Sequence, residues 1–396
     1  MLVSASTYPW DVARLGVDVV IDDLVARGIE MVDLAAAYHP IDAFSPRDGA
    51  FFTSPRGAVH VPVRAERYGR IVPSTSSPDV CAAWPAVAER AKAAGLGLSA
   101  WTVTLFQPWI VDAHPDCARV LADGTALSTG VCPANDDFRE YLTALCLDVV
   151  DQFGVDLVRL ESVMPLGYNV DWLRPRVLVD VPGVARDLLT LCFCPACVRH
   201  GADAGLDVER LRNDVRAAIA AEIGQGPGAS TEAFAADPEL QSFLSQHEQA
   251  SIELCRSVVD GLRDTGAKVA STIRTPFPAL RRGAGTALTE QLATVVDQLS
   301  VHPAGGEGNR RIAAIAASAP HPVALGMLIT RGLQFPGVTA SPDPDAPDPL
   351  PAQLAEAMRL GVHEVGLYNY GLLRDADVDL FMEAVRAVRA SHEPPI

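Results

Sequence analysis

The chain of 396 residues lacks the apolar stretch of about 18 residues that a membrane-spanning helix requires. It also has few basic residues: 32 Lys and Arg stand against 49 Asp and Glu, which gives a formal net charge of −17. This charge argues against nucleic acid and anionic membranes as partners. The first residues, MLVSASTYPWD, contain no basic segment followed by an apolar core, so we expect no signal peptide and a cytoplasmic protein.

Short apolar segments typical of strands alternate with longer amphipathic segments typical of helices. In the longer segments, apolar residues recur at intervals of three and four, and glycines end several of them. Strands are predicted at residues 2–8, 30–38, 96–106, 155–162, 267–275, 296–302, 322–331 and 363–371. Predicted helices include 85–95, 136–154, 207–223, 239–251, 253–266, 352–361 and 375–390.

Eight strand–helix repeats predict an α/β protein with a closed (β/α)8 TIM barrel, in a single domain over residues 1–396. An open, doubly wound sheet is the alternative. However, no G-x-G-x-x-G follows the first strand, which argues against a dinucleotide-binding sheet.

Three connections are too long for simple turns, and each follows the carboxyl end of a predicted strand: residues 39–80, 163–266 and 341–351. The second is expected to form a helical excursion. Barrels place their active sites on this face, so the long connections are expected to shape a pocket. The alternative is that these connections are insertions with no role in catalysis.

Three of the eight cysteines lie within LCFCPACVRH, as Cys192, Cys194 and Cys197. Their odd number and close spacing argue against a disulfide. A C-x-C-x-x-C cluster is typical of one side of a tetrahedral zinc site, whose fourth ligand must come from elsewhere in the chain. The alternative is a buried cluster without metal, since close thiolates repel unless protons or a cation neutralise them.

The segment GVCPANDDFREYLTAL (130–145) precedes the fourth predicted strand, and CFCPAC (192–197) follows it. This arrangement resembles the beta-galactosidases of glycoside hydrolase family 42, in which a lone cysteine joins a downstream C-x-C-x-x-C to hold zinc. The resemblance implies a structural zinc bound by Cys132, Cys192, Cys194 and Cys197, because four sulfur ligands leave no open position. Cys117 is the alternative to Cys132.

Other stretches are similar to a set of uncharacterised bacterial barrel proteins described as glycosidase-like. These stretches are AAAYHP (35–40), SAWTVTLF (99–106), HPDCA (114–118), CPAND (132–136), LES (160–162) and CFCPAC (192–197).

The resemblance to glycoside hydrolase family 42 also implies that Glu161, at the end of LVRLE, is the acid/base of a glycoside hydrolase acting on a small glycoside or oligosaccharide. A carboxylate that leaves an apolar strand is partly desolvated, so its proton affinity should rise, as a general acid requires. The alternative is a structural glutamate paired with Arg159 or Arg274. The sequence departs from the family at Leu160, where an Asn is usual, and in strand seven, which has no carboxylate.

Glycoside hydrolysis usually needs a second carboxylate. Asp11 and Glu307, which follow the first and sixth strands, are the candidates, and each could instead be a solvated loop charge or a helix cap. Asp297 is expected to begin strand six and to point away from the pocket.

Aromatic and polar residues near strand ends suit a polyol pocket, although about half of them could be core residues with a satisfied polar tip. The candidate substrate-binding residues are Tyr38, His39, Trp101, Arg274, His302, Tyr368 and Tyr370.

Two other functions stay open. The opening of the chain resembles xylose-isomerase-like barrels, which implies a sugar isomerase, epimerase or lyase with a divalent metal at the strand ends. Strands five, seven and eight offer Arg274, Thr330 and Asn369 there, which is an incomplete ligand set. The third hypothesis is a catalytically inactive carbohydrate-binding barrel. In each case the expected partner is a small carbohydrate, and a homo-oligomer is one option for the assembly.

Overall fold

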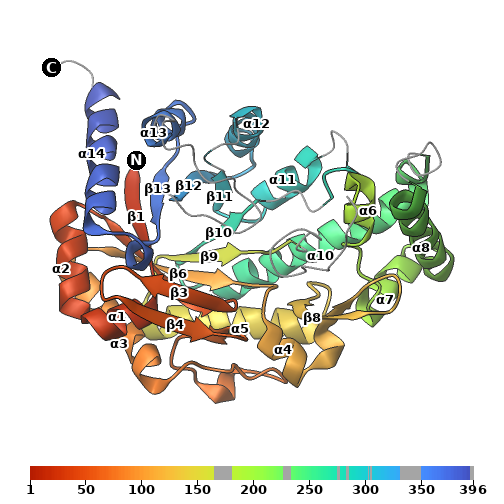
Figure 1. Cartoon of the computed structure of the whole chain (residues 1–396), viewed down its shortest axis with the longest axis horizontal. Coiled ribbons are helices and arrows are strands. Elements are labelled where there is room, and N and C mark those ends of the chain that lie inside the picture. Colours follow the sequence, from red (N-terminus) through yellow and green to blue (C-terminus); the bar gives the residue numbers. More distant parts are fainter. Residues whose placement is uncertain are drawn as a thin grey trace.

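The computed structural model describes residues 1–164, 181–225, 233–273, 277–281, 285–301, 303, 306–330 and 349–392. Eight parallel strands close into a barrel (Figure 1), because the first strand pairs with both the second and the last. The predicted (β/α)8 barrel is therefore confirmed, and the alternative of an open sheet is excluded. The barrel strands are β1 (Leu2–Thr7), β2 (Met31–Tyr38), β6 (Gly97–Val103), β9 (Leu157–Glu161), β10 (Lys268–Thr272), β11 (Gln298–Val301), β12 (Ala324–Thr330) and β13 (Glu364–Tyr368).

Helices connect the strands and surround the barrel. In α5 (Asp136–Phe153), both ends of the helix are set by capping residues. Asn135 accepts a hydrogen bond from the backbone of Phe138 at the start, and Gly154 ends the helix in a left-handed conformation. The main connecting helices are α1 (Pro9–Leu15), α2 (Val17–Arg27), α3 (Pro78–Ala94), α5 (Asp136–Phe153), α10 (Pro238–Leu262), α11 (Gly285–Ala293), α12 (Gly306–Ala317), α13 (Leu350–Arg359) and α14 (Asp375–His392).

The connections after β2 and β6 contain short strands that the sequence analysis did not predict. Antiparallel hairpins form between β3 (Ile41–Ser45) and β4 (Ala50–Ser54), and between β7 (Ala118–Val120) and β8 (Ala126–Val131). The short β5 (Ala58–Val59) pairs antiparallel with the end of β2. Short helical segments complete these regions: η1 (Ala65–Arg67), α4 (Pro108–Ala113), η2 (Pro115–Cys117) and, after β13, η3 (Tyr370–Leu372).

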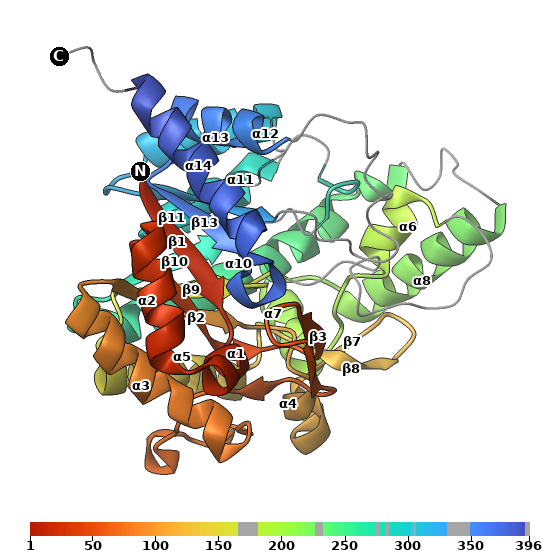
Figure 2. The same cartoon turned by 60° about the vertical axis from the view of Figure 1, so that its left-hand side comes forward.

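The excursion after β9 builds a second hydrophobic core outside the barrel. It contains α6 (Gly183–Leu188), α7 (Pro195–Asp203), α8 (Val208–Gln225) and the first half of α10, and Figure 2 shows α6 and α8 projecting away from α2 and α14. We call residues 181–225 and 233–250, together with Cys132, which packs in the same core, the cysteine lobe. Its core also takes residues from the connections after β6 and β10, such as Ala122 and Phe277. All these segments leave carboxyl ends of strands, so the lobe lies on that side of the barrel.

The long helix α10 differs from the prediction of two helices at 239–251 and 253–266, because it is one continuous helix of 25 residues. Its first half buries Phe243 and Leu244 in the lobe core, whereas its second half buries Leu254 and Val258 in the barrel core. The buried residues of both halves recur at intervals of three and four along the helix, so a single face of α10 packs against both cores.

Polar side chains fill one layer of the barrel interior. Arg159 of β9 donates to Asp33 of β2 (3.2 Å) and to Glu364 of β13 (2.6 Å), and all three side chains are buried. Burial opposes ionisation of Glu364, but Arg159 and the hydrogen bonds from Ser4 and Gln298 outweigh burial and lower its pKa to about 2. Arg159 is therefore paired inside the barrel, which corrects the alternative in which it pairs with Glu161.

In the described part of the chain, no helix combines the length and the apolar character needed to cross a membrane.

Candidate active site and metal centre

Glu161 is the last residue of β9 and lies two positions after Arg159, so the alternation of a strand turns both side chains into the barrel. The indole Nε1 of Trp101 donates a hydrogen bond of 2.6 Å to Glu161 Oε2. The backbone carbonyl of Glu161 accepts from both the amide and the hydroxyl of Thr104, each at 2.8 Å. Both the side chain and the backbone of Glu161 are thus held by the segment that begins in β6.

The residue after Glu161 has an uncommon backbone conformation. Ser162 has a φ of 60°, in the left-handed region that residues other than glycine seldom occupy. Such positions concentrate at functional sites, where the surrounding structure maintains them. Sequence reasoning missed this turn, since serine is not typical of positive φ.

Three tyrosines from three strand ends meet beside Glu161. The hydroxyl groups of Tyr8, Tyr38 and Tyr368 lie 3.0 Å from one another in all three pairs. Burial raises the pKa of all three phenols, those of Tyr8 and Tyr38 well above the ordinary value, and the charge of Glu161 raises those of Tyr38 and Tyr368 further. The three phenols are therefore neutral near pH 7, and Glu161 lies close enough to two of them to affect their ionisation.

Trp101 packs within this group of tyrosines. Its ring stacks on Tyr8, with centroids 5.7 Å apart, and meets the edges of Tyr38 (4.8 Å) and Tyr368 (5.5 Å). We call Glu161, Trp101 and the three tyrosines the mouth cluster. The structure thus brings together four residues predicted from the sequence and one that was missed, Tyr8. Its position directly after the first predicted strand could have identified Tyr8 as a residue of the site.

The other predicted binding residues have different surroundings. The Nδ1 atom of His39 lies 2.6 Å from the carbonyl of Pro40 and donates to it, and burial lowers the pKa of His39 to about 4, so its ring is neutral. Tyr370 donates to Asp23 of α2 (2.8 Å) and lies under the guanidinium of Arg47 (3.7 Å), outside the mouth cluster. Arg274 and His302 lie outside the described residues.

The two candidates for a second carboxylate do not join the mouth cluster. Asp11, on α1, is 1 % exposed; Arg14 donates to its Oδ1 (2.9 Å), whereas its Oδ2 has no hydrogen-bond partner among the described residues. A Cβ on Gly371 would lie 1.7 Å from that Oδ2, so the carboxylate packs directly against the glycine. Burial outweighs Arg14 and raises the pKa of Asp11 to about 7. Glu307 is exposed in the first turn of α12 and pairs with Arg311.

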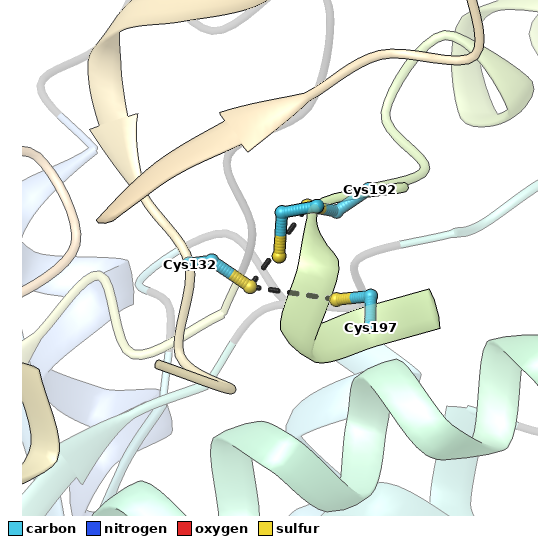
Figure 3. A group of neighbouring side chains, drawn as sticks. Cys132, Cys192 and Cys197 are labelled. Atoms are coloured by element: carbon cyan, nitrogen blue, oxygen red, sulfur yellow. Dashed lines mark hydrogen bonds between the residues drawn. The ribbon is translucent and has the colours of Figure 1, made fainter. Parts of the chain in front are cut away.

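Four buried thiols form a group that could hold a metal ion, and their sulfurs all lie within 4.8 Å of one another. The group consists of Cys132, Cys192, Cys194 and Cys197. Figure 3 shows Cys132, on the segment after β8, facing Cys197 (3.4 Å) and Cys192 (3.8 Å) across the gap between two connections. Sulfurs bound to zinc at about 2.3 Å in a tetrahedron lie roughly 3.8 Å apart, so the group fits that geometry.

Neighbouring residues support this thiol group. The backbone amide of Val120 donates to Cys192 Sγ (3.5 Å), and the ring of His247 on α10 contacts the backbone of Cys192 (3.0 Å). Cys117 lies outside the four, and its carbonyl accepts from the amide of Cys132 (2.9 Å). The structure therefore places Cys132, and not Cys117, with the C-x-C-x-x-C cluster.

A groove of about 2030 Å³ lies at the opposite end of the barrel, where the strands begin. Two of its carboxylates hold strand starts, since Asp156 accepts from the amide of Leu98 (2.9 Å) and Asp297 from the amide of Val269 (2.8 Å). Asp151 and Asp260 form ion pairs with arginines. Asp297 thus points away from the mouth cluster, as predicted. Because these groups are structural, we place the candidate site at the mouth cluster.

No protein-family model and no curated protein matches the chain. Solved structures do, beginning with an alpha-L-fucosidase, isoenzyme 2 from Paenibacillus thiaminolyticus (14 % identity, TM-score 0.57, 99 % of this chain and 50 % of that chain). A beta-galactosidase from the psychrophilic Marinomonas ef1 matches at 14 % identity with a TM-score of 0.56, over 99 % of this chain and 60 % of that chain. The glycoside hydrolase domain of PgaB (BpsB) from Bordetella bronchiseptica matches at 14 % identity with a TM-score of 0.53, over 97 % and 99 %.

These similarities show a barrel fold shared with glycoside hydrolases. The chain spans 50 % and 60 % of the length of the fucosidase and the galactosidase. At 14 % identity the likeness concerns the fold, and the chemistry has to be argued from the site.

Proposed function

We propose that the protein is a glycoside hydrolase that acts on a small glycoside or oligosaccharide, with Glu161 as its general acid/base. The observation that carries this proposal is the position of Glu161, a carboxylate turned into the barrel at a strand end and held there by Trp101. Catalytic groups of TIM barrels come from this end of the strands. The similarity of fold to three glycoside hydrolase structures supports the proposal.

In the proposed reaction, the carboxylic acid of Glu161 protonates the glycosidic oxygen as the bond to the anomeric carbon breaks. Within the mouth cluster, Glu161 and Tyr368 are partly exposed and face a substrate first, whereas Tyr8, Tyr38 and Trp101 lie buried behind them. The tyrosine hydroxyls keep oxygen lone pairs that can accept hydrogen bonds from sugar hydroxyls. Asp11 and Glu307 stay candidates for the second carboxylate.

We also propose that the four cysteines bind a structural zinc ion. Bound zinc would join the segment after β8 to the start of α7, and so fix one wall beside the barrel mouth. All four sulfurs would be ligands, so the metal would supply stability and no open position for a substrate. Location in the cytoplasm, where thiols stay reduced, is part of the same proposal.

The isomerase hypothesis gains no support from the described residues. There, the one group of three or more His, Cys, Asp or Glu side chains that could hold a metal is the cysteine group in the lobe. A metal-dependent isomerase needs carboxylate and imidazole ligands at the strand ends.

The proposal is tested by hydrolysis of a panel of aryl glycosides and by turnover of free sugars, each with and without a chelator. Glu161→Gln should keep the fold and ligand binding and lower turnover by roughly 10²–10⁴-fold. Substrates with good leaving groups should lose less, because they need little proton donation. The matched control is Glu209→Gln, which removes an exposed carboxylate on α8.

Wild-type rates in Glu161→Gln on the true substrate would contradict the catalytic assignment. Chelator-sensitive interconversion of free sugars would favour the isomerase, and binding without turnover would favour an inactive carbohydrate-binding barrel.

A further inference from the structure

We infer that Trp101 is a positioning residue that determines which oxygen of Glu161 carries the transferable proton. The inference rests on the proposed function, since it concerns the proton that Glu161 donates. It assigns Trp101 a role through its N–H group, whereas the sequence suggested a surface for stacking on sugars.

The hydrogen-bond chemistry of the pair carries the argument. An indole N–H can only donate, and here it donates to Glu161 Oε2 at 2.6 Å. If Oε2 carried the acidic proton, the indole would donate to a hydroxyl oxygen, which is a weaker acceptor than the carbonyl oxygen of the acid. The proton of the carboxylic acid therefore belongs on Oε1, and Oε1 is the atom from which it is transferred to the substrate.

The packing of Trp101 makes this arrangement rigid. The ring is 2 % exposed, and it stacks on Tyr8 while it meets the edges of Tyr38 and Tyr368. A ring held on several sides has one accessible orientation, so its N–H stays directed at the carboxylate. The face of the ring is covered by protein, which leaves the N–H as the group that acts on the site.

The indole N–H also shifts the proton equilibrium of Glu161. Donation to a carboxylate favours the ionised form, whereas burial disfavours it, so Trp101 opposes the desolvation expected from the apolar strand. Among the described groups, the phenols of Tyr38 and Tyr368 stay neutral, and Arg159 is bonded to Asp33 and Glu364. Trp101 thus makes Glu161 a stronger acid than it would otherwise be.

The first experiment measures the pair without any substrate. The indole ¹H–¹⁵N resonance of Trp101, assigned as the signal lost in Trp101→Phe, is followed from about pH 3 to about pH 9, the range in which carboxyl groups titrate. It should shift along a single titration curve in the wild type, and that curve should vanish in Glu161→Gln. A resonance that ignores pH, or one that still titrates in Glu161→Gln, would overturn the inference.

The second experiment measures catalysis. The alkaline limb of the pH profile of kcat/KM reports the general acid, and in Trp101→Phe it should move upward by about one pH unit. The control is Trp84→Phe, which also loses a buried indole hydrogen bond, the one to Ala35 (2.9 Å), but none to Glu161. That variant should keep the wild-type profile.

If Trp101→Phe fails to fold, benzothienylalanine at position 101 removes only the N–H and keeps the ring. An unchanged alkaline limb in a folded variant, with Glu161→Gln inactive, would overturn the positioning role alone. Wild-type hydrolysis by Glu161→Gln would overturn the proposed function and the inference with it, and the two failures are therefore distinguishable.

Discussion

The barrel interior and the cysteine lobe both bury groups that carry charge, but they reach neutrality by different means. In the barrel, Arg159 lies between Asp33 and Glu364, so the chain supplies its own cation. In the lobe, four thiols meet within 4.8 Å and require either protons or a bound cation. The barrel therefore supplies the counter-charge for its own buried carboxylates, whereas the thiols of the lobe need protons or, as we propose, a metal ion.

The largest effect is expected from removing one thiol of the lobe. Cys132→Ser should lower the bound zinc from one equivalent and lower thermal stability at the same time, because metal binding contributes on the order of 10 kcal/mol to the folding of small zinc sites. Elemental analysis and thermal denaturation measure the two quantities.

The control is Cys255→Ser in the barrel core, where burial raises the pKa of the thiol to about 12 and keeps it protonated. This variant should retain the zinc. Zinc-free wild-type protein, freshly purified and reduced, would refute the site, and full zinc content in Cys132→Ser would point to Cys117.

A smaller effect is expected from removing the cation of the barrel. Arg159→Met leaves two buried carboxylates without their partner and should lower the free energy of unfolding by about 3–5 kcal/mol. Chemical denaturation measures this change. The double variant with Glu364→Gln should recover part of the loss, and a loss below about 1 kcal/mol would show that the carboxylates do not need Arg159.

The smallest effect concerns Asp11, which the chain neutralises only in part. Its pKa rises from 3.8 to about 7 on folding, so the folded state binds the proton more tightly, and stability falls as pH rises from about 4 to about 7. Asp11→Asn removes this penalty and should stabilise the protein by roughly 1–2 kcal/mol at pH 8, since the loss of the pair with Arg14 offsets part of the gain. At pH 5 the two proteins should be equally stable. Equal stability at both pH values would contradict the raised pKa.

The fold followed from the sequence because strand periodicity and glycine-ended helices are local signals. All eight barrel strands lie within the predicted segments. The hairpin of β3 and β4 was missed because it depends on pairing within a long connection. The continuity of α10 was missed although its buried residues recur at intervals of three and four through the predicted break at Ile252, so that break was wrong.

The site was predictable as far as strand ends define it. Glu161, Tyr38, Trp101 and Tyr368 were identified from their positions, and the structure brings them together. Whether Glu161 and the zinc act as proposed stays a prediction. The alternative pairing of Arg159 with Glu161 was wrong, because Arg159 binds Asp33 and Glu364. These two residues belong to β2 and β13, and neither strand is a neighbour of β9 in the sheet. Such contacts across the barrel depend on its closure and register.

The continuity of α10 gives the molecule a single cooperative unit where its two cores suggest two. The helix has 25 residues and is therefore about 37 Å long. Its first half contacts α7 beside the cysteines, and its second half packs on α5 and β10 of the barrel. Opening the lobe frays a helix that the barrel also uses, so hydrogen exchange in the barrel half of α10 will report the state of the four thiols.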